Sequence, residues 1–332
     1  MRSLVVCVLL AACAESVDVD VVEQEAACSN KFYCGPNTPK LGVLSFFELD
    51  MTGTTAAPTT GVVLHKFEDG AGVAMRLDVD GVRLRGIRPN GTIVQGGLPA
   101  PAGLLDAKLT IKRGPQTFVV KITSVTANQH FYEGAGVAVP SAFPSYGMTV
   151  TEVGVAGKPR NLCNVPHNDT SMFPVAPYEV LISRGNRYDP STGQVYATGA
   201  QTGTWFNLAC TGDAISKVEV IGYNQLVHAA GLKSEKEQRT AATHAIRAGY
   251  CGDGIAYTES GTWIDIANAG GWLTQATVLD ATNIEAIWDQ HGAVCLTNKR
   301  LPLAIVGCKI DPCTAVQIAD PFSYGELVTL IP

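Results

Sequence analysis

Charged residues are scarce in this chain, and basic residues do not outnumber acidic ones. Of its 332 residues, 16% are Asp, Glu, Lys or Arg, and 24 Lys and Arg against 30 Asp and Glu leave a net charge of -6. Nucleic-acid binding needs clustered basic side chains that neutralise phosphates. The composition therefore argues against nucleic acid as a partner.

Long apolar runs, metal-ligand patterns and familiar catalytic motifs are also missing. The apolar stretch at residues 4–14 is shorter than the roughly 20 residues that cross a bilayer as a helix. The chain contains no G-x-S-x-G, H-E-x-x-H or phosphate-loop sequence. No C-x-x-C pair occurs and the six histidines are scattered, so we expect no bound metal and no cofactor.

The N-terminus has the pattern of a bacterial lipoprotein signal. Arg2 precedes the short apolar run 4–10, and Leu10-Ala11-Ala12-Cys13 places small residues before a cysteine, as a lipobox does. We expect residues 1–12 to be removed and Cys13 to be acylated, which attaches the chain to a membrane. An ordinary secretory signal is the alternative, but it lacks a clear A-x-A-like cleavage site.

The residues after Cys13 predict how and where the protein is held. Residues 14–27 contain five acidic side chains and no core pattern, so residues 13–40 are expected to be the lipidated cysteine and an acidic tether. No aspartate follows Cys13, which favours the outer membrane, on its periplasmic or surface face. The expected location is therefore exported and lipid-anchored.

Eight cysteines follow Cys13, and an even number in an exported chain predicts four disulfides. The sequence leaves their connectivity open. Short loops around Gly35-Pro36 and Asp311-Pro312 favour the pairs Cys28 with Cys34 and Cys308 with Cys313. The full set is Cys28, Cys34, Cys163, Cys210, Cys251, Cys295, Cys308 and Cys313.

Short alternating apolar runs separated by turn residues dominate residues 41–157 and predict an antiparallel β domain. The clearest element is a hairpin over residues 75–87, in which Asp80-Gly81 is a residue pair that suits a type I′ turn. Counting outward from that turn gives the pairs Val79 with Val82, Leu77 with Leu84, and Asp78 with Arg83.

The second half of the chain has one well-marked helix. Ser234 and Glu237 form a capping-box pattern. The alanine-rich face predicts close packing on a sheet, with Thr240, His244 and Arg247 facing away. Gly249 is expected to end the helix in the left-handed conformation. The residues of the packed face are Ala241, Ala242, Ala245 and Ile246.

Several short motifs occur together around this helix. They are Arg247-Ala248-Gly249-Tyr250-Cys251-Gly252-Asp253-Gly254, Gly261-Thr262-Trp263-Ile264-Asp265, Leu162-Cys163, Asn207-Leu208-Ala209-Cys210 with Gly222-Tyr223, and Trp288 with Gly292-Ala293-Val294-Cys295. In this order they resemble the ADYC domain, a family of exported proteins and lipoproteins of myxobacteria and related bacteria, whose naming motif is R-A-D-Y-C-G-D-G. The resemblance covers roughly residues 160–300.

The departures from the family pattern carry further implications. Val218 and Ala242 stand where the family commonly has cysteines. Because both cysteines are absent here, the resemblance implies that in the family these two positions form one disulfide. It then leaves Cys163 to pair with Cys210 and Cys251 to pair with Cys295. Gly249 stands where the family has an aspartate, so no catalytic role can depend on that carboxylate. The resemblance also implies two strands around a turn at residues 289–292, where propensity alone would allow a helix.

We therefore expect a mainly β (α+β) protein. An N-terminal antiparallel β domain is followed by a disulfide-braced β-rich domain with one main helix, and a cluster of glycines and prolines before Cys163 marks the boundary. The expected segments are a signal peptide (1–12), the lipidated cysteine and tether (13–40), the β domain (41–157), the ADYC-like domain (158–313) and a C-terminal extension (314–332).

The sequence indicates no reaction. Cys251 with His244 suggests a thiol dyad, but a cysteine beside seven others is more often bridged. Asp253 and Asp265, with Glu285 and Asp289, could supply a carboxylate pair for glycoside cleavage, although solvated turn acids are the commoner case. His244, Asp253 and Asp265 are therefore weak catalytic candidates.

The expected function is the non-enzymatic binding of a partner protein or glycan by a membrane-anchored body. The alternative is an exported hydrolase that acts on envelope or external polymers. A contiguous exposed patch would favour binding, whereas two carboxylates converging in a cleft would favour the enzyme. The tryptophans that could form such a patch are Trp263, Trp272 and Trp288.

Overall fold

The computed structural model describes the chain in separate stretches. These are residues 40–41, 44–95, 101–128, 143–163, 179–185, 187–189, 194–196, 203–223, 235–258, 262, 264–271, 273 and 279–331. Several residues of interest lie outside them: Cys13 and the rest of the signal and tether, Cys28, Cys34, Ser234, Trp263 and Trp272. What the sequence predicts for those residues stays a prediction.

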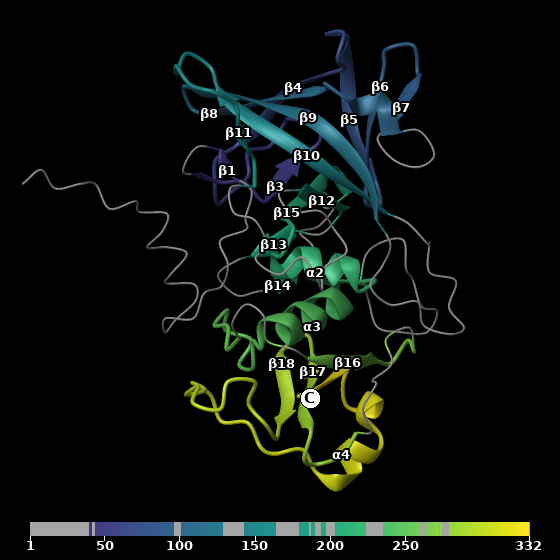
Figure 1. Cartoon of the computed structure of the whole chain (residues 1–332), viewed down its shortest axis with the longest axis vertical. Helices are drawn as coiled ribbons and strands as arrows, with labels where there is room; N and C mark the ends of the chain where they lie inside the picture. Colours follow the sequence, from purple (N-terminus) through teal and green to yellow (C-terminus); the bar gives the residue numbers. More distant parts are fainter. Residues whose placement is uncertain are drawn as a thin grey trace, which may run out of the picture.

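Antiparallel sheet dominates the described residues, and the prediction of a mainly β protein is confirmed (Figure 1). The larger sheet has eleven strands in the order β3-β15-β12-β10-β9-β8-β4-β5-β6-β7, with β11 paired to β10. Its strands are β3 (Glu48–Asp50), β4 (Val63–Glu68), β5 (Ala74–Asp80), β6 (Arg83–Ile87), β7 (Ile93–Gln95), β8 (Lys108–Arg113), β9 (Gln116–Asn128), β10 (Phe143–Glu152), β11 (Arg160–Asn161), β12 (Glu179–Arg184) and β15 (Trp205–Cys210). Two further pairs are β1 (Lys40–Leu41) with β2 (Leu44–Ser45), and β13 (Arg187–Asp189) with β14 (Gln194–Tyr196).

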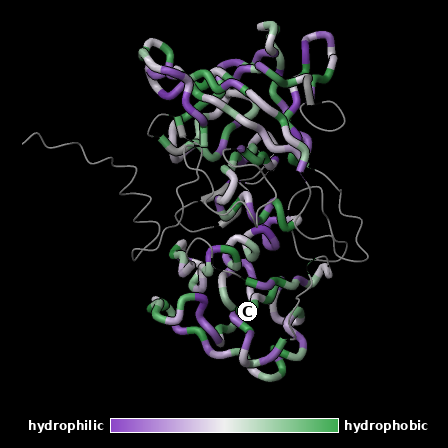
Figure 2. Tube along the Cα trace, viewed as in Figure 1, coloured by the Kyte–Doolittle hydropathy of each residue, from purple (hydrophilic) through white to green (hydrophobic). Residues whose placement is uncertain are grey.

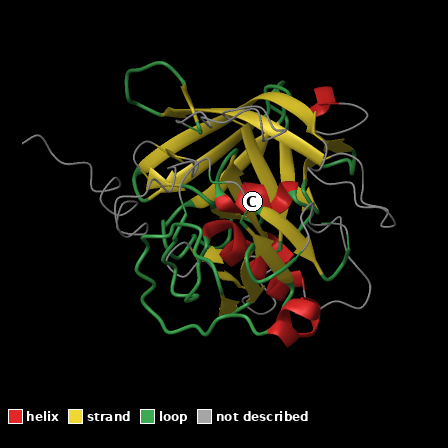
Figure 3. Cartoon of the chain, turned by 60° about the horizontal axis from the view of Figure 1, so that its bottom comes forward, coloured by secondary structure: helices red, strands yellow, loops and turns green. Residues whose placement is uncertain are grey.

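A smaller sheet and a helical layer complete the fold. The smaller sheet has the order β16 (Asp265–Asn268), β19 (Leu327–Leu330), β17 (Ile284–Asp289) and β18 (Gly292–Leu296). The helices are α2 (Ala214–Val220), α3 (Glu235–Arg247) and α4 (Ala315–Ala319), with short 3-10 turns η1 (Pro101–Leu104) and η3 (Pro321–Ser323). Figures 1 and 3 show α2 and α3 between the two sheets. α3 contacts α2 on one side and β17, β18 and β19 on another.

Alternation of side chains explains why the strands of the larger sheet form. In β9, Phe118, Val120 and Ile122 are buried while the residues between them are half-exposed. Figure 2 shows hydrophobic and hydrophilic positions interleaved along such strands. Successive side chains of a strand point to opposite faces, so this pattern buries one face of the sheet.

The larger sheet includes strands from both sides of residue 157, where the sequence suggests a domain boundary. β12 pairs with both β10 and β15, and β15 also pairs with β3. The disulfide Cys163–Cys210, with Cα atoms 5.7 Å apart, fastens the residues after β11 to β15. This pairing, which the family resemblance implies, is confirmed. β19, from the expected C-terminal extension, lies between β16 and β17.

The hairpin over residues 75–87 forms, but the register predicted for it is wrong. The ladder places Asp78 opposite Arg85, so the two-residue loop is Gly81-Val82 and not Asp80-Gly81. In this register the Nε of Arg85 lies 2.5 Å from Oδ2 of Asp78. Val82, the hydrophobic residue of this loop, is buried in a separate cluster that also contains Phe143, Leu181 and Val220. Tertiary packing and a cross-strand ion pair thus outweigh the local turn preference.

α3 confirms the predicted helix, but its surroundings differ from the prediction. Residues 238–245 are all buried, including Thr240 and His244, which were expected to face away. The reason is that α3 is covered on one side by α2 and on another by the smaller sheet. The left-handed residue at its end is Ala248, with a φ of 51°, and not Gly249.

The hydrogen bonds at the end of α3 explain this one-residue shift. The N–H of Ala248 bonds to the carbonyl of Ala245 at 3.3 Å, and the N–H of Gly249 bonds to that of His244 at 2.8 Å. This is the Schellman pattern, in which the residue before Gly249 takes the left-handed conformation. Gly249 instead provides space, because a Cβ there would lie 3.1 Å from the Nδ1 of His244.

The hairpin around residues 289–292 is confirmed, but two of the disulfides expected near it are wrong. The bridges are Cys251–Cys308 and Cys295–Cys313. The segment that follows Cys308 runs beside β18, because the N–H of Leu296 bonds to the carbonyl of Asp311 at 3.0 Å. This pairing brings Cys313 to Cys295 and leaves Cys308 to Cys251.

We expect peptide mapping under non-reducing conditions to recover these bridges. After digestion with trypsin and chymotrypsin, the peptide of Cys251 should be linked to that of Cys308, and the peptide of Cys295 to that of Cys313. Cleavage after Lys309 separates Cys308 from Cys313, so a direct link between those two residues is easily recognised. Such a link in mass spectra would contradict the pairing.

Candidate functional site

The most exposed large hydrophobic residues of the described chain lie in one loop. Leu303 is 93% exposed and Ile305 is 84% exposed. They belong to residues 301–307, which follow β18 and which we call the apolar loop. Figure 1 draws it as a yellow loop beside β18, and Figure 2 marks hydrophobic residues along it. Such exposure of neighbouring aliphatic side chains is uncommon on a soluble surface unless they bind something.

Tyr250 holds the start of the apolar loop. Its hydroxyl accepts a hydrogen bond from the backbone N–H of Arg300 and donates one to Oε1 of Glu285, both at 2.8 Å. Arg300 in turn binds Glu285 through two nitrogens, with Nε at 3.1 Å from Oε1 and Nη2 at 2.8 Å from Oε2. All three side chains are buried. The residue just before the loop is therefore fixed by its side chain and its backbone.

Arg300 also binds backbone carbonyls at the C-terminal end of α3. Its Nη2 donates to the carbonyl of Ala245 at 2.7 Å and its Nη1 to that of Ile246 at 2.9 Å. Carbonyls at the end of a helix lack partners within the helix and favour a nearby cation. Burial raises the pKa of Tyr250, so its hydroxyl keeps the proton that it donates to Glu285. The network thus joins α3, β17 and the apolar loop.

Cys251, which follows Tyr250 in the sequence, holds the far end of the apolar loop. It is bridged to Cys308, with Cα atoms 5.8 Å apart. The hydroxyl of Tyr257 also accepts a hydrogen bond from the N–H of Gly307 at 3.1 Å. Nζ of Lys299, which lies just before the loop, donates to the carbonyl of Ala304 within it at 2.5 Å. Adjacent residues of one motif, Tyr250 and Cys251, therefore hold the two ends of the apolar loop.

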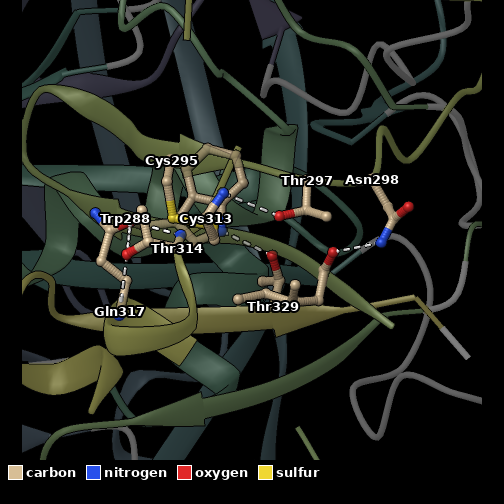
Figure 4. The surroundings of a disulfide bond; sticks show 9 residues. Trp288, Cys295, Thr297, Asn298, Cys313, Thr314, Gln317 and Thr329 are labelled. Atoms are coloured by element: carbon tan, nitrogen blue, oxygen red, sulfur yellow. Dashed lines mark hydrogen bonds between the residues drawn. A yellow bond between two sulfur atoms is a disulfide. The ribbon is translucent and has the colours of Figure 1, made fainter. Parts of the chain in front are cut away.

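The second bridge fastens the chain that leaves the loop, as Figure 4 shows. Cys295 of β18 is bonded to Cys313, and the N–H of Cys313 donates to Oγ1 of Thr297 at 3.1 Å. Thr314 then begins α4 through a capping box with Gln317. The segment after the apolar loop is consequently held against β18.

The apolar loop borders a hollow of about 540 Å³. Most of the lining residues are aliphatic, and they come from the loop, from β18 and from the segment after Cys308. The lining residues include Leu296, Pro302, Leu303, Ile305, Val306 and Ile310. Lys299, Ala304 and Cys308 complete the lining.

His244, a weak catalytic candidate, lies inside the molecule. Its side chain is 1% exposed, and Nε2 has no hydrogen-bond partner within the described residues. Burial, with a smaller effect from Arg247, lowers its pKa to about 4, although the backbone of Gln290 and the charges of Asp289 and Asp253 act in the opposite direction. The imidazole is therefore neutral at physiological pH and does not face solvent.

The other candidate residues have structural roles or lie apart. Asp253 is exposed and accepts a hydrogen bond from the N–H of Ile255 at 3.0 Å, which is typical of a turn. Asp265 begins β16, at the opposite edge of the smaller sheet from β18. The thiol of Cys251 is consumed in its bridge, so it cannot be a nucleophile.

The remaining candidate carboxylates, Glu285 and Asp289, also have structural roles. So does Trp288, the one tryptophan of the expected patch that lies in the described residues. Glu285 is bound to Arg300, and Asp289 accepts the N–H of His291 at 2.7 Å. Trp288 is fully buried, and its Nε1 donates to Oγ1 of Thr329 at 2.7 Å. It therefore supports the smaller sheet and is not part of an exposed patch.

The motifs and patterns of the sequence do not predict the apolar loop. The available signal was the run Leu301-Pro302-Leu303-Ala304-Ile305-Val306, which is apolar throughout and ends just before Cys308. A run of this kind is normally a buried strand, and sequence alone does not show what covers it.

Two further observations concern the described residues. No three His, Cys, Asp or Glu side chains there gather as metal ligands would. The helices within the described ranges are all too short or too polar to span a bilayer.

Comparison with known proteins gives one match. The family model of the ADYC domain matches residues 101–302, which is more than half of the chain. The match begins at η1, which precedes β8 of the larger sheet, and so includes residues before the motifs at residues 160–300. It ends inside the apolar loop. No curated protein and no solved structure matched the chain.

We expect His244 to make the protein less stable in acid. Between pH 4 and pH 6.5, the buried imidazole is neutral in the folded protein and gains a proton on unfolding. The contribution of His244 to the free energy of unfolding is therefore complete above pH 6.5 and is lost as the pH falls towards 4. Between pH 7 and pH 5 this amounts to about 2 kcal/mol. The measurement is urea unfolding at both pH values for the native protein and for His244→Gln, which should lose less stability. Equal losses in the two proteins would contradict the prediction.

Proposed function

This chain belongs to the ADYC domain family, and we propose that it is a non-enzymatic binding protein held at a membrane by a lipid on Cys13. The single observation that carries the binding role is the exposure of Leu303 and Ile305 on a loop fixed at both ends. The partner that this surface suits is another protein with an apolar groove or patch.

Rigidity of the loop supports this role. Ordering a mobile loop on binding costs free energy, whereas a loop already held in place avoids most of that cost. The start of the apolar loop is held by Tyr250, and its end by the bridge between Cys251 and Cys308. Nothing in the packing of the smaller sheet requires Leu303 and Ile305 to be hydrophobic, because both point into solvent. Binding to a partner would explain why these two exposed side chains are hydrophobic.

A protein suits the loop better than a glycan does. Aliphatic side chains offer no hydrogen bonds to sugar hydroxyls, but they fill apolar pockets well. Trp288, whose ring could have stacked on a sugar, is buried. The chemistry of the apolar loop therefore favours a protein partner.

The lipid anchor rests on the sequence. Leu10-Ala11-Ala12-Cys13 is a lipobox pattern, and acyl chains on Cys13 would keep the protein at a membrane. Three disulfides among the described residues fit an oxidising compartment outside the cytoplasm. We place the protein at the outer membrane, on its periplasmic or surface face.

The anchor can be tested by metabolic labelling with a palmitate analogue. We expect the native protein to take up the label and to fractionate with membranes. Cys13→Ser should remain unlabelled and uncleaved, because signal removal at a lipobox requires the modified cysteine. A native protein that takes up no label, or that is released with an N-terminus beyond Cys13, would rule out the anchor.

The binding surface can be tested with a photo-crosslinking residue at position 305 in cells that make the protein. The cross-linked protein is identified, purified and titrated with the native chain. We expect Leu303→Ser with Ile305→Ser to weaken binding about tenfold or more, because central apolar anchors dominate such interfaces. Val316→Ser is the matched control, since Val316 is 66% exposed on α4 and outside the loop. Both variants should unfold at the native urea concentration, because exposed side chains contribute little to stability.

Three outcomes of this work would contradict the proposal. The double variant binds as tightly as the native protein, or Val316→Ser weakens binding equally, or position 305 cross-links only to lipid. A hydrolase would replace it if the purified protein cleaves peptidoglycan, glycan or peptide and Asp253→Asn abolishes cleavage with an unchanged melting temperature.

A further inference from the structure

Strands β4 and β5 of the larger sheet are neighbours that separate. Their ladder holds only two residue pairs, Phe67 with Met75 and Glu68 with Ala74. Beyond these pairs β4 continues along β8 and β5 continues along β6, and Figure 1 shows the two strands running in different directions. Residues 63–66 and 76–78 therefore have no strand partner on their facing edges within the described part of the chain. Further along β5, the carbonyl of Val79 accepts a hydrogen bond from Nη1 of Arg184 at 2.8 Å.

A cavity of about 320 Å³ occupies the gap, and we call it the β4–β5 cleft. Its floor is apolar and includes Phe67, Met75 and Leu77, which are buried. Arg184 and the loops that carry Thr52 and Thr204 also line the cavity. The volume is at the low end of the range for ligand sites, enough to enclose a short segment.

The rim of the cleft is positively charged, although the whole chain has a net charge of -6. Lys66, Arg76 and Arg184 line it together with His65, against Asp78 as the only lining carboxylate. Asp78 is already bound by Arg85 and Arg184. Lys66 is paired with Glu68 at 2.5 Å. Arg76 is exposed and forms no ion pair within the described residues.

We propose that the β4–β5 cleft binds an acidic, extended peptide segment of a partner protein, which enters as a short strand between β4 and β5. Unpaired strand edges supply backbone hydrogen bonds to a peptide added as a strand. The apolar floor receives alternate side chains of that peptide, because successive residues of a strand point to opposite faces. Arg76 and the rim around it receive the acidic side chains. This site is separate from the apolar loop and does not depend on it.

A synthetic peptide of alternating valine and acidic residues is a suitable probe. The sequence VDVDVVE, which occurs at residues 17–23 of this chain, has that pattern. We expect the fluorescein-labelled peptide to bind the native full-length protein in an anisotropy titration. A version with lysine at each acidic position should bind about tenfold more weakly or worse. A version with methylated backbone nitrogens at alternate residues should also bind weakly, because strand addition needs those N–H groups.

Protein variants then locate the site. Arg76→Glu should weaken binding of the acidic peptide about tenfold or more and restore some binding of the lysine version. Arg160→Glu is the matched control, since Arg160 is an exposed arginine on β11, and β8, β9 and β10 lie between β11 and β4. It makes the same charge change and should leave the affinity unchanged. Thermal unfolding of each variant checks that the fold is intact.

The proposal fails if the native protein does not bind the acidic peptide, if Arg76→Glu and Arg160→Glu weaken it equally, or if backbone methylation has no effect. Binding of glucuronate but not of the peptide would assign the cleft to acidic sugars instead. If the peptide binds only after Asp18 and Asp20 are both changed to Asn, the occupant is the chain's own acidic segment and not a partner.

Discussion

A buried ion pair between Arg300 and Glu285 is the constraint on which the C-terminal half depends. Charges removed from water are costly unless every donor and acceptor finds a partner. Glu285 binds the guanidinium twice and accepts the hydroxyl of Tyr250, while Arg300 also reaches two carbonyls at the end of α3. Removing either Arg300 or Glu285 would leave the charge of the other buried without its counter-charge. The helix, β17 and the start of the apolar loop are therefore held by one network.

This arrangement separates the residues that hold the loop from those that we propose to contact a partner. Tyr250 and Cys251 belong to the motif for which the family is named, and they are buried or bridged. Leu303 and Ile305 touch little of the protein itself. A scaffold of this kind can keep its brace while the exposed side chains change with the partner. The motif thus holds the loop in place, and under the proposed function the loop supplies the contacts with the partner.

The two proposed binding surfaces lie on different sheets. The β4–β5 cleft belongs to the larger sheet and the apolar loop to the smaller one, with α2 and α3 between them (Figure 1). Their chemistry also differs, because one rim is cationic and the other surface is aliphatic. The two proposals therefore concern unlike partners on different sheets.

Local patterns in the sequence determined the β-rich class, the helix over residues 235–247 and, through the family resemblance, the hairpin around residues 289–292 and the bridge Cys163–Cys210. These follow from periodicity and turn chemistry, which act between near neighbours. Only the tertiary structure decided the pairing of Cys251 with Cys308, the pairing of Asp78 with Arg85, and the left-handed conformation of Ala248. Each depends on segments far apart in sequence, or on how tightly the end of a helix packs. The exposure of Leu303 and Ile305 is of the same kind, because hydrophobicity is a property of the residue whereas burial depends on what the rest of the chain covers.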